Sequence, residues 1–321
     1  MKSILETGNL NGKRVLVRVD WSVPTQDGKV LDDYQIKKSL PTIEYLRNAG
    51  AKIVLISHAE KDTDSLLPIF QHVKEYLPLT FIEPSNLVLL ENLRQNSGEK
   101  ENSEVFARTL ADMGDIFVNE AFPVSHREHA SLVGVPKLIP AYAGLWFAKE
   151  IEELSRAFNP PHPFLLILGG AKSETKIPLI EKFLNTADDI FVGGTLARAI
   201  SEMPISKNPK ITFPVGDIAA LDANKETLFL LEEKIKNSEF ILWNGPLGNY
   251  EKGFKEGTLR LAKILANSGK QVVVGGGDTL AVIEELNILD KFSFVSTGGG
   301  AMLDFLAEGT LPGIEALKSS R

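Results

Sequence analysis

The sequence contains no cysteine among its 321 residues, which excludes disulfide bonds and metal sites built on thiolates. It has no basic block, and its formal net charge is -7, so a nucleic-acid-binding protein is disfavoured. No apolar run reaches the roughly 18–20 residues that a membrane span requires. The first twenty residues lack the apolar core and small-residue cleavage site of a signal peptide. We therefore expect a soluble, cytoplasmic protein.

Short apolar runs alternate with amphipathic helical patterns along nearly the whole chain. The runs expected as strands are 14–20, 51–58, 87–92, 115–121, 164–170, 189–194, 240–245, 271–277 and 292–300. They are too apolar to alternate, and each is followed by a helical pattern, which is typical of parallel sheets covered on both faces. Several of the helical patterns end in glycine, the usual C-terminal stop. The sequence therefore predicts the α/β class.

A division of the chain is expected at residues 143–163, where one helical pattern runs into a proline-rich break. The length also favours two domains, so we predict two doubly wound parallel-sheet domains joined by a hinge helix. Four of the five histidines precede residue 150, whereas the glycine-rich strand ends follow residue 165. Ligands bind outside the carboxyl ends of such strands. The first half should offer cationic side chains there, and the second half bare backbone.

The stretch "QVVVGGGDTLAVIEEL" (271–286) joins an apolar run to a helical pattern through three glycines. Glycine allows backbone N–H groups to approach a ligand, and the following helix N-terminus suits a phosphate. Asp278 can either cap that helix or hold Mg²⁺ on a bound nucleotide. The hydroxyl group of Thr279 can contact a phosphate.

Similar glycine turns recur at 169–172, 193–195 and 297–301. One such turn is as readily a tight turn with a capping Asp, but four in one half favour a nucleotide cleft. The glycine spacings of dinucleotide-binding and P-loop proteins are missing. Lys172 and Lys176 follow the first turn at helical spacing, where they can reach phosphates. Two solvated surface lysines are the alternative interpretation.

Polar side chains in the first half follow the predicted strands at similar positions. The residues are Asp20, Ser57, His58, Arg94 and Arg127. Each alone could be a cap or a rim salt bridge, but their shared position favours a site for one small anion. Arginine binds a phosphate or a carboxylate through two parallel hydrogen bonds. For the neighbouring His126 and His129 we prefer a structural role.

The order of these motifs from residue 12 onward resembles the phosphoglycerate kinase family. The matching stretches are "GKRVLVRVDWSVP", "DGKVLDDYQI", "SLPTIEYLRNAGAKIVLISH", "LLENLR", "VNEAFPVSHREHAS", "LILGGAK", "WNGPLGNYE", "VVGGGDT", "FVSTGGGAMLDFL" and "LPGIEAL". The resemblance implies a monomeric kinase that passes a phosphoryl group reversibly between 1,3-bisphosphoglycerate and MgADP in glycolysis. It implies a phosphoglycerate-binding domain (1–145, with 305–321 packing back on it), a hinge helix (146–160) and a nucleotide-binding domain (161–304).

The resemblance also implies roles for individual residues. Phosphoglycerate binding falls to Asp20, Ser22, His58, Arg94 and Arg127. Catalysis falls to Lys172, Gly276 and Gly277, and Asp278 holds Mg²⁺. The ATP or ADP site comprises Lys172, Lys176, Gly194, Glu251, Gly275, Gly276, Gly277, Asp278 and Thr279. Positioning and charge neutralisation, which these groups supply, are what phosphoryl transfer requires.

The chain departs from the family pattern at several positions. Gln35 replaces the family's central catalytic arginine, and Ser22 replaces a substrate-binding asparagine. "SHAEKD" (57–62) replaces "SHLGRP", and "LDANKET" (221–227) replaces a Gly-Pro-Lys-Thr turn. The chain is also shorter than the family norm. Loss of an arginine that stabilises a transferring phosphate can lower the rate by about 10³–10⁵, although Lys37, Lys38 or Lys61 could supply another cation.

Three hypotheses remain open at this point. The first is an active, minimal phosphoglycerate kinase, impaired by Gln35. The second is a weak or inactive paralogue that senses a nucleotide or a phosphorylated metabolite. The third is a kinase that acts on a related carboxylate. The retained lysines, Asp278, Arg94 and Arg127 favour the first.

Overall fold

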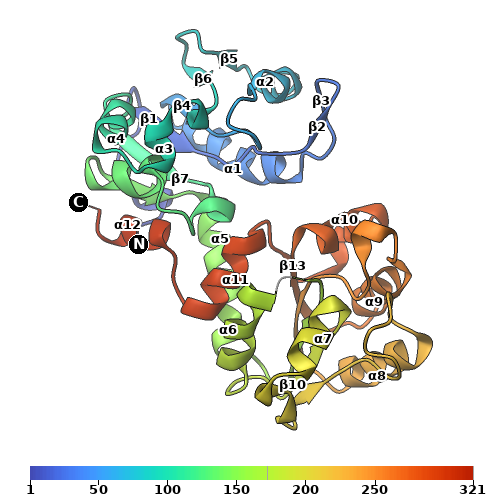
Figure 1. Cartoon of the computed structure of the whole chain (residues 1–321). Helices are drawn as coiled ribbons and strands as arrows, with labels where there is room; N and C mark the ends of the chain where they lie inside the picture. The colour runs from blue at the N-terminus through green and yellow to red at the C-terminus, as the bar shows by residue number, and fades with distance from the viewer. Residues whose placement is uncertain (172, 321) are drawn as a thin grey trace. The chain divides into compact units, whose positions relative to one another are not determined.

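The computed structural model describes residues 1–171 and 173–320. The chain forms two compact units, each with its own parallel sheet (Figure 1). Unit 1 comprises Met1–Ile151 and Thr310–Arg321, and unit 2 comprises Glu152–Gly309. The fold is therefore α/β with two parallel-sheet units.

The sheet of unit 1 is six-stranded, in the order β5-β6-β4-β1-β7-β8. Its strands are β1 (Arg14–Arg18), β4 (Lys52–Ile56), β5 (Thr80–Phe81), β6 (Leu87–Leu89), β7 (Ile116–Asn119) and β8 (Ala141–Ala143). All neighbours run parallel, and Val15 in β1 lies opposite Ile53 on one side and Ile116 on the other. The chain builds β4 and β6 on one side of β1 and β7 on the other, so the direction of winding reverses beside β1.

Helices and a small hairpin complete unit 1. The hairpin pairs β2 (Thr25–Gln26) with β3 (Lys29–Val30). The helices are α1 (Tyr34–Asn48), α2 (Leu67–Val73), α3 (Ser97–Lys100), α4 (Glu104–Ala111), the first part of α5 (Leu145–Ser155) and α12 (Pro312–Lys318). Single helical turns lie at η1 (Ile4–Glu6), η2 (Leu93–Gln95), η3 (Phe122–Val124), η4 (Ala130–Gly134) and η5 (Val135–Lys137). Apolar residues of β1, β4, α1 and α2 form a shared core.

The segment that contains α12 returns to unit 1 after the whole of unit 2 (Figure 1, red beside green). Ala316 packs in a small apolar cluster with residues of η3 and η4. The Gly313 N–H donates to the Ser125 carbonyl oxygen at 2.9 Å, and the Ala141 N–H donates to the Ser320 hydroxyl at 2.9 Å. The unit is therefore assembled from two separated stretches of sequence.

Unit 2 repeats the layout, with a six-stranded parallel sheet in the order β11-β10-β9-β12-β13-β14. Its strands are β9 (Phe164–Leu168), β10 (Asp189–Val192), β11 (Ile211–Thr212), β12 (Phe240–Asn244), β13 (Gln271–Gly275) and β14 (Phe294–Val295). Every residue of β9 and β12 is buried, as expected for strands covered on both faces. The direction of winding reverses between these two strands.

The helices of unit 2 cover its sheet. They are the end of α5, α6 (Ser173–Phe183), α7 (Gly194–Ser201), α8 (Lys225–Lys236), α9 (Glu256–Ala266), α10 (Gly277–Glu285) and α11 (Gly299–Glu308). Single turns lie at η6 (Arg156–Phe158), η7 (Pro204–Lys207), η8 (Tyr250–Lys252) and η9 (Leu289–Lys291). Within residues 1–171 and 173–320, no helix is long and apolar enough to cross a membrane.

Candidate functional site

Four residues that the sequence singled out lie just past the carboxyl ends of neighbouring strands in unit 1. Asp20 follows β1 and His58 follows β4, while Arg94 and Arg127 come after β6 and β7. The structure brings them together: His58 Nδ1 lies 3.8 Å from Asp20 Oδ1, and the charges of Asp20 and Arg127 both act on the pKa of Arg94. The predicted convergence at this edge of the sheet is present.

A fifth residue, the charged Arg18, lies at the centre of this group and was missed by the sequence analysis. Its guanidinium is fully buried and donates to Ser131 Oγ at 2.9 Å, to the Val19 carbonyl at 2.5 Å and to His58 Nδ1 at 3.1 Å. Glu99, also fully buried, accepts from both the N–H and the hydroxyl of Ser131 and lies 3.9 Å from Arg18. The sequence did contain a signal for Arg18, because it is a charged residue inside the apolar run "RVLVRVD".

The contact between Arg18 and His58 fixes the form of the imidazole. A guanidinium can only donate, so Nδ1 of His58 accepts and the ring proton lies on Nε2. Burial, assisted by the positive charges of Arg18 and Arg94, lowers the pKa of His58 to about 3. His58 is therefore a neutral hydrogen-bond donor at neutral pH.

Asp20 is held as a carboxylate by its neighbours. Its burial acts to raise its pKa, but the interaction with His58, the hydrogen bonds from Ser22 and the charge of Arg18 together lower the pKa. Asp20 Oδ1 accepts from the Ser22 hydroxyl at 2.6 Å and from the Ser22 N–H at 3.2 Å. Ser22 therefore orients Asp20.

Among these residues, Arg94 gives the strongest indication that the site binds an anion. Its Nε and Nη2 atoms are buried and have no hydrogen-bond partner among the described residues. Burial and the nearby charges of Arg127 and Arg18 lower its pKa. Arg127 is exposed. Because buried donors without partners are costly, a carboxylate or phosphate ligand would satisfy the group.

The altered segment "SHAEKD" is organised by Asn92. The Asn92 amide nitrogen donates to the carbonyl oxygens of Lys61, Asp62 and Asp64, and its oxygen accepts from the N–H groups of Ala59 and Arg94. The segment is thus fixed to the backbone that carries Arg94.

The cations considered as substitutes for the family's arginine have other contacts or lie exposed. Gln35 itself is half-buried in the first turn of α1. Lys37 pairs with Asp33 at 2.9 Å, Lys38 lies over the rings of Tyr34 and Trp146, and Lys61 is exposed. Lys37 and Lys38 would have to leave these partners to reach a ligand.

Unit 2 contains a cavity of about 360 Å³ at the carboxyl ends of its strands. It is lined by residues of the turns after β9, β12 and β13 and of the start of α11, six of them glycine, together with Lys176, Glu251, Asp278 and Thr279. An adjoining hollow of about 120 Å³ shares Glu251 and Asp278 and adds Thr195, which follows Gly194. Three of the four glycine turns line the main cavity, and the fourth adjoins it. Lys172 lies outside the described residues.

The turns after β9 and β12 approach so closely that both require glycine. A Cβ atom at Gly169 would overlap the carbonyl oxygen of Pro246, and one at Gly245 would lie 2.5 Å from the carbonyl oxygen of Gly169. Gly245 also has a φ of +92°. These glycines therefore permit the crossing of two backbones where the winding of the sheet reverses.

Lys176 lies at this crossing. Its side chain is buried, and Nζ donates to the carbonyl oxygen of Gly169. A Cβ at Gly245 would lie 2.9 Å from the same Nζ. The alternative of a solvated surface lysine therefore does not apply to Lys176.

The turn "GGGDT" places its groups in distinct ways. Gly276 has a φ of +105° and precedes α10, which no side chain caps within the described part of the chain. Asp278 is exposed in the first turn of α10, so the capping alternative is not what the structure adopts. Thr279 is fully buried, and its Oγ accepts from the Gly245 N–H at 3.0 Å, so it joins this turn to the one after β12.

The carboxylates of this cavity fit only a shared magnesium site. Within residues 1–171 and 173–320, no group of three or more His, Asp or Glu residues could enclose a metal ion. Mg²⁺ is usually bound through one or two carboxylates together with substrate phosphates. Asp278 beside a glycine-rich cavity fits that arrangement.

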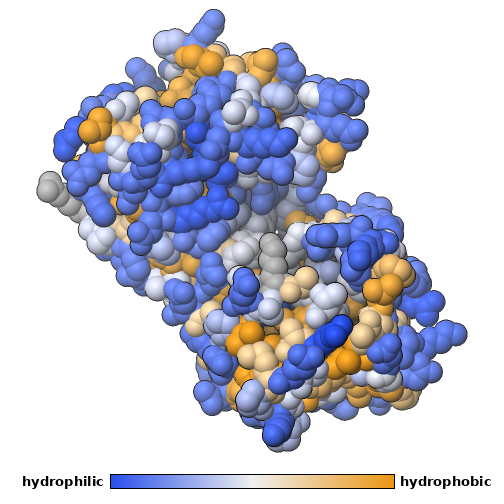
Figure 2. All heavy atoms as spheres, viewed as in Figure 1, coloured by the Kyte–Doolittle hydropathy of each residue, from blue (hydrophilic) through white to orange (hydrophobic). Residues whose placement is uncertain are grey.

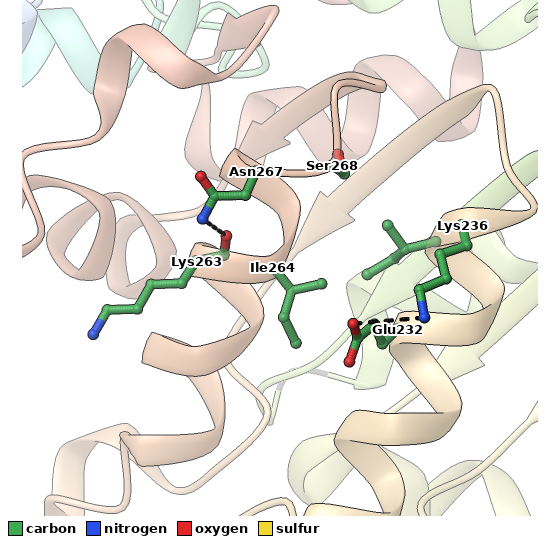
Figure 3. Close-up of a pocket in the computed structure, with 7 residues that line it drawn as sticks. Glu232, Lys236, Lys263, Ile264, Asn267 and Ser268 are labelled. Carbon is green, nitrogen blue, oxygen red and sulfur yellow. Dashed lines mark hydrogen bonds and ion pairs between the residues drawn. The ribbon is translucent and has the colours of Figure 1, made fainter.

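A further hollow of about 430 Å³ lies between α8 and α9 (Figure 3). Its side chains are those of an ordinary helix surface: Lys236 pairs with Glu232 at 3.7 Å, and Asn267 donates to the Lys263 carbonyl at 2.9 Å. It contains neither glycine turns nor residues of the two sites above, and we assign it no function.

Comparison with known proteins identifies the family to which the chain is similar. The family model described as phosphoglycerate kinase matches residues 5–208 and 202–309. Curated relatives named phosphoglycerate kinase include one from Leptospira biflexa, 35% identical over 386 residues with 98% of each chain covered. Another, from Clostridium kluyveri, is 36% identical over 393 residues with 99% of each covered. Both alignments exceed the 321 residues of this chain, so these relatives contain segments that it lacks.

Solved structures agree with the sequence matches. The phosphoglycerate kinase of Coxiella burnetii has a TM-score of 0.85 at 32% identity, with 98% of both chains covered. That of Pyrococcus horikoshii has a TM-score of 0.88 at 28% identity, covering 99% of this chain and 98% of the other. With likeness of sequence and fold over nearly its whole length, the chain belongs to the phosphoglycerate kinase family of phosphotransferases.

Proposed function

We propose that the protein transfers a phosphoryl group reversibly between 1,3-bisphosphoglycerate and MgADP, giving 3-phosphoglycerate and ATP. Binding of the phosphoglycerate is supported by Arg94, which lies near other arginines and whose Nε and Nη2 have no hydrogen-bond partner among the described residues. The glycine-rich cavity beside Asp278 supports binding of the nucleotide. We further infer a glycolytic role, in the cytoplasm, for a monomer.

In the direction of ATP use, a carboxylate oxygen of 3-phosphoglycerate forms a bond to the γ-phosphorus. The bond from that phosphorus to the β-phosphate oxygen breaks, and its electron pair leaves with ADP. No proton needs to be transferred. The protein's task is therefore to position the two reactants and to offset negative charge.

Unit 1 would bind the phosphoglycerate. Arg94 and Arg127 supply donors for its phosphate and carboxylate oxygens, and neutral His58 supplies one N–H from Nε2. Asp20, oriented by Ser22, accepts from the substrate hydroxyl group. Arg18 holds His58 in this form.

Unit 2 would bind the nucleotide. The turns at Gly194 and at Gly275–Gly277 offer backbone N–H groups to the phosphates, and Lys176 adds positive charge. Glu251 contacts the sugar, and Thr279 holds the turn that carries Gly245. Mg²⁺ bound by Asp278 and the phosphates would offset phosphate charge. We also assign Lys172, with Gly276 and Gly277, to the phosphoryl group in transfer.

A coupled assay of purified protein with 3-phosphoglycerate and MgATP tests the reaction. We expect turnover that requires both substrates, and MgADP should raise the melting temperature. Kinship over the full length favours an enzyme over a non-catalytic nucleotide sensor. Binding of MgADP without any turnover in either direction would contradict the kinase and favour the sensor.

A further inference from the structure

The segment that carries Glu251 is held by a residue from a different part of the chain. Asp222 precedes α8, yet its Oδ2 accepts from the Gly257 N–H in the first turn of α9 at 3.1 Å. Its Oδ1 accepts from the Ala223 N–H at 2.8 Å. Asp222 thus joins the segment before α8 to the start of α9.

This contact replaces a missing local cap. The residue before α9 is Lys255, whose side chain makes no capping hydrogen bond. The first N–H groups of a helix need acceptors, and a carboxylate is favoured there by the helix dipole. The carboxylate of Asp222 therefore serves as a cap for α9 from 35 positions away in the sequence.

The same contact closes one end of the loop that lines the nucleotide cavity. Residues 246–255 connect β12 to α9 and place Pro246, Gly248 and Glu251 at the cavity and the hollow beside it. The Asn249 N–H donates to the Leu221 carbonyl at 2.9 Å, next to Asp222. A Cβ at Gly257 would lie 2.6 Å from Asp222 Oδ1, so carboxylate and backbone fit tightly.

We propose that Asp222 is a positioning residue for the nucleotide: it fixes the loop of residues 246–255 so that Glu251 meets the sugar rather than the phosphates. This inference rests on the proposed function. Its specific consequence is that the sugar end of the ligand depends on Asp222, whereas the phosphate end, bound at the glycine turns, does not.

The test compares MgADP with magnesium pyrophosphate, which lacks a sugar, by calorimetry on the full chain. Asp222→Ala should weaken MgADP binding about tenfold and change pyrophosphate binding by less than about twofold. Asp222→Asn, which keeps one acceptor, should lie between. Glu256→Gln is the matched control, because Glu256 lies in the same turn, exposed and paired with Arg260. The control should bind both ligands as the unchanged protein does.

Steady-state rates provide a second measurement. Asp222→Ala should raise KM for the nucleotide while KM for 3-phosphoglycerate and kcat stay nearly unchanged. Equal weakening of MgADP and pyrophosphate, or a lower melting temperature with unchanged MgADP affinity, would overturn the inference. If the unchanged protein binds MgADP but neither Asp222 variant differs from it, the inference fails alone. If the unchanged protein does not bind MgADP, the proposed function fails with it.

Discussion

In unit 1 the carboxyl ends of the strands lead to buried charged side chains, whereas in unit 2 they lead to glycine. Arg18, Glu99 and His58 are all nearly inaccessible in unit 1. In unit 2 the comparable positions hold Gly169, Gly245 and Gly276, whose only polar groups are those of the backbone. Two sheets of the same layout thus present different chemical groups at their candidate sites.

The difference has an energetic consequence for each unit. Guanidinium groups that lie close together repel, so an anion bound in unit 1 would relieve a repulsion that is present in the ligand-free site. Backbone N–H groups carry no net charge, but glycine turns restrict the chain to conformations that other residues rarely adopt. Under the proposed function, unit 1 would therefore select its ligand by charge, and unit 2 by shape and hydrogen bonding.

The faces of the two units that are visible in one view differ in hydropathy. Figure 2 shows hydrophilic residues over most of the visible face of unit 1, and more hydrophobic residues on the visible face of unit 2. Large hydrophobic residues are nevertheless exposed in both units. Leu31, Ile82 and Val105 are examples in unit 1, and Val215, Phe229 and Phe254 are examples in unit 2.

The largest expected effect comes from breaking the backbone crossing in unit 2. Gly169→Ala places a Cβ against the carbonyl oxygens of Pro246 and Gly245, and neither backbone can yield cheaply. We expect MgADP binding to fall by about 100-fold or more, with a loss of roughly 2–4 kcal/mol of stability. Calorimetry and denaturant unfolding measure both.

The control for this variant is Gly8→Ala, because a Cβ at Gly8 meets nothing within 4 Å. It should leave nucleotide binding and unfolding unchanged. Gly169→Ala that still binds 3-phosphoglycerate would confirm that the damage is confined to unit 2. Normal MgADP affinity in Gly169→Ala would contradict the role given to the crossing.

The next effect concerns charge in unit 1. Arg94→Ala should weaken binding of 3-phosphoglycerate by about 10- to 100-fold, the scale of hydrogen bonds to a charged group. Because it removes buried donors without partners and repulsion by Arg127 and Arg18, it should also leave the ligand-free protein as stable or more stable. Calorimetry and thermal unfolding without ligand test the two halves, with exposed Arg108→Ala as the control. Clear destabilisation would show that Arg94 is structural.

A gain of function is expected at Gln35. A neutral amide cannot offset the charge of a transferring phosphoryl group, so Gln35→Arg should raise kcat by about an order of magnitude or more. Gln35→Lys supplies the charge without the planar fork and should gain less. Initial rates in both directions at saturating substrates give the comparison. An unchanged kcat in Gln35→Arg would mean that the surroundings of Gln35 no longer support an arginine.

The smallest expected effect is a pH dependence of the unfolding free energy, caused by Glu120 in unit 1. This buried carboxyl accepts from the Thr42 hydroxyl at 2.6 Å and from the N–H groups of Trp146 and Phe147, at the start of α5, at 3.0 Å. Burial raises its pKa to about 7, from an ordinary 4.5. The folded chain therefore retains a proton that the unfolded chain releases, and this stabilisation, present below pH 4.5, is lost as the pH rises through 7.

Glu120→Gln should remove this decrease of the unfolding free energy with rising pH. Between pH 4.5 and 7 the unchanged protein should lose on the order of 1–3 kcal/mol of unfolding free energy relative to the variant. Urea unfolding at several pH values measures the difference. Parallel stability curves for the two proteins would show that Glu120 does not titrate in this range.

Long apolar strands were predictable because burial on both faces leaves a continuous apolar run. Each of the nine expected runs contains a strand, from β1 to β14. The strands that the pattern missed, such as β5, β8 and β11, have two or three residues and are defined by pairing with a neighbour. β6 and β14 are equally short, so strand length alone does not decide which strands the pattern finds.

The site was predictable where a residue follows a strand, and less so where a partner comes from elsewhere. Asp20, His58 and Arg94 were found from their positions, and glycine turns indicated the cavity. Glu99 and Asp222 could not be found in this way, because "SGEKEN" and "LDANKET" read as exposed polar segments. Their importance depends on contacts with distant backbone, which no local pattern records.

The return of α12 to unit 1 has a consequence for biosynthesis. Residues 310–321 follow all of unit 2 in the chain, yet they supply Ala316 to an apolar cluster of unit 1 and the Ser320 hydroxyl to β8. As the chain emerges from the ribosome, the first unit to be translated therefore lacks part of its own packing until the second has been made. Unit 2 has all its residues in one continuous stretch, so it can complete its structure during translation before unit 1 does.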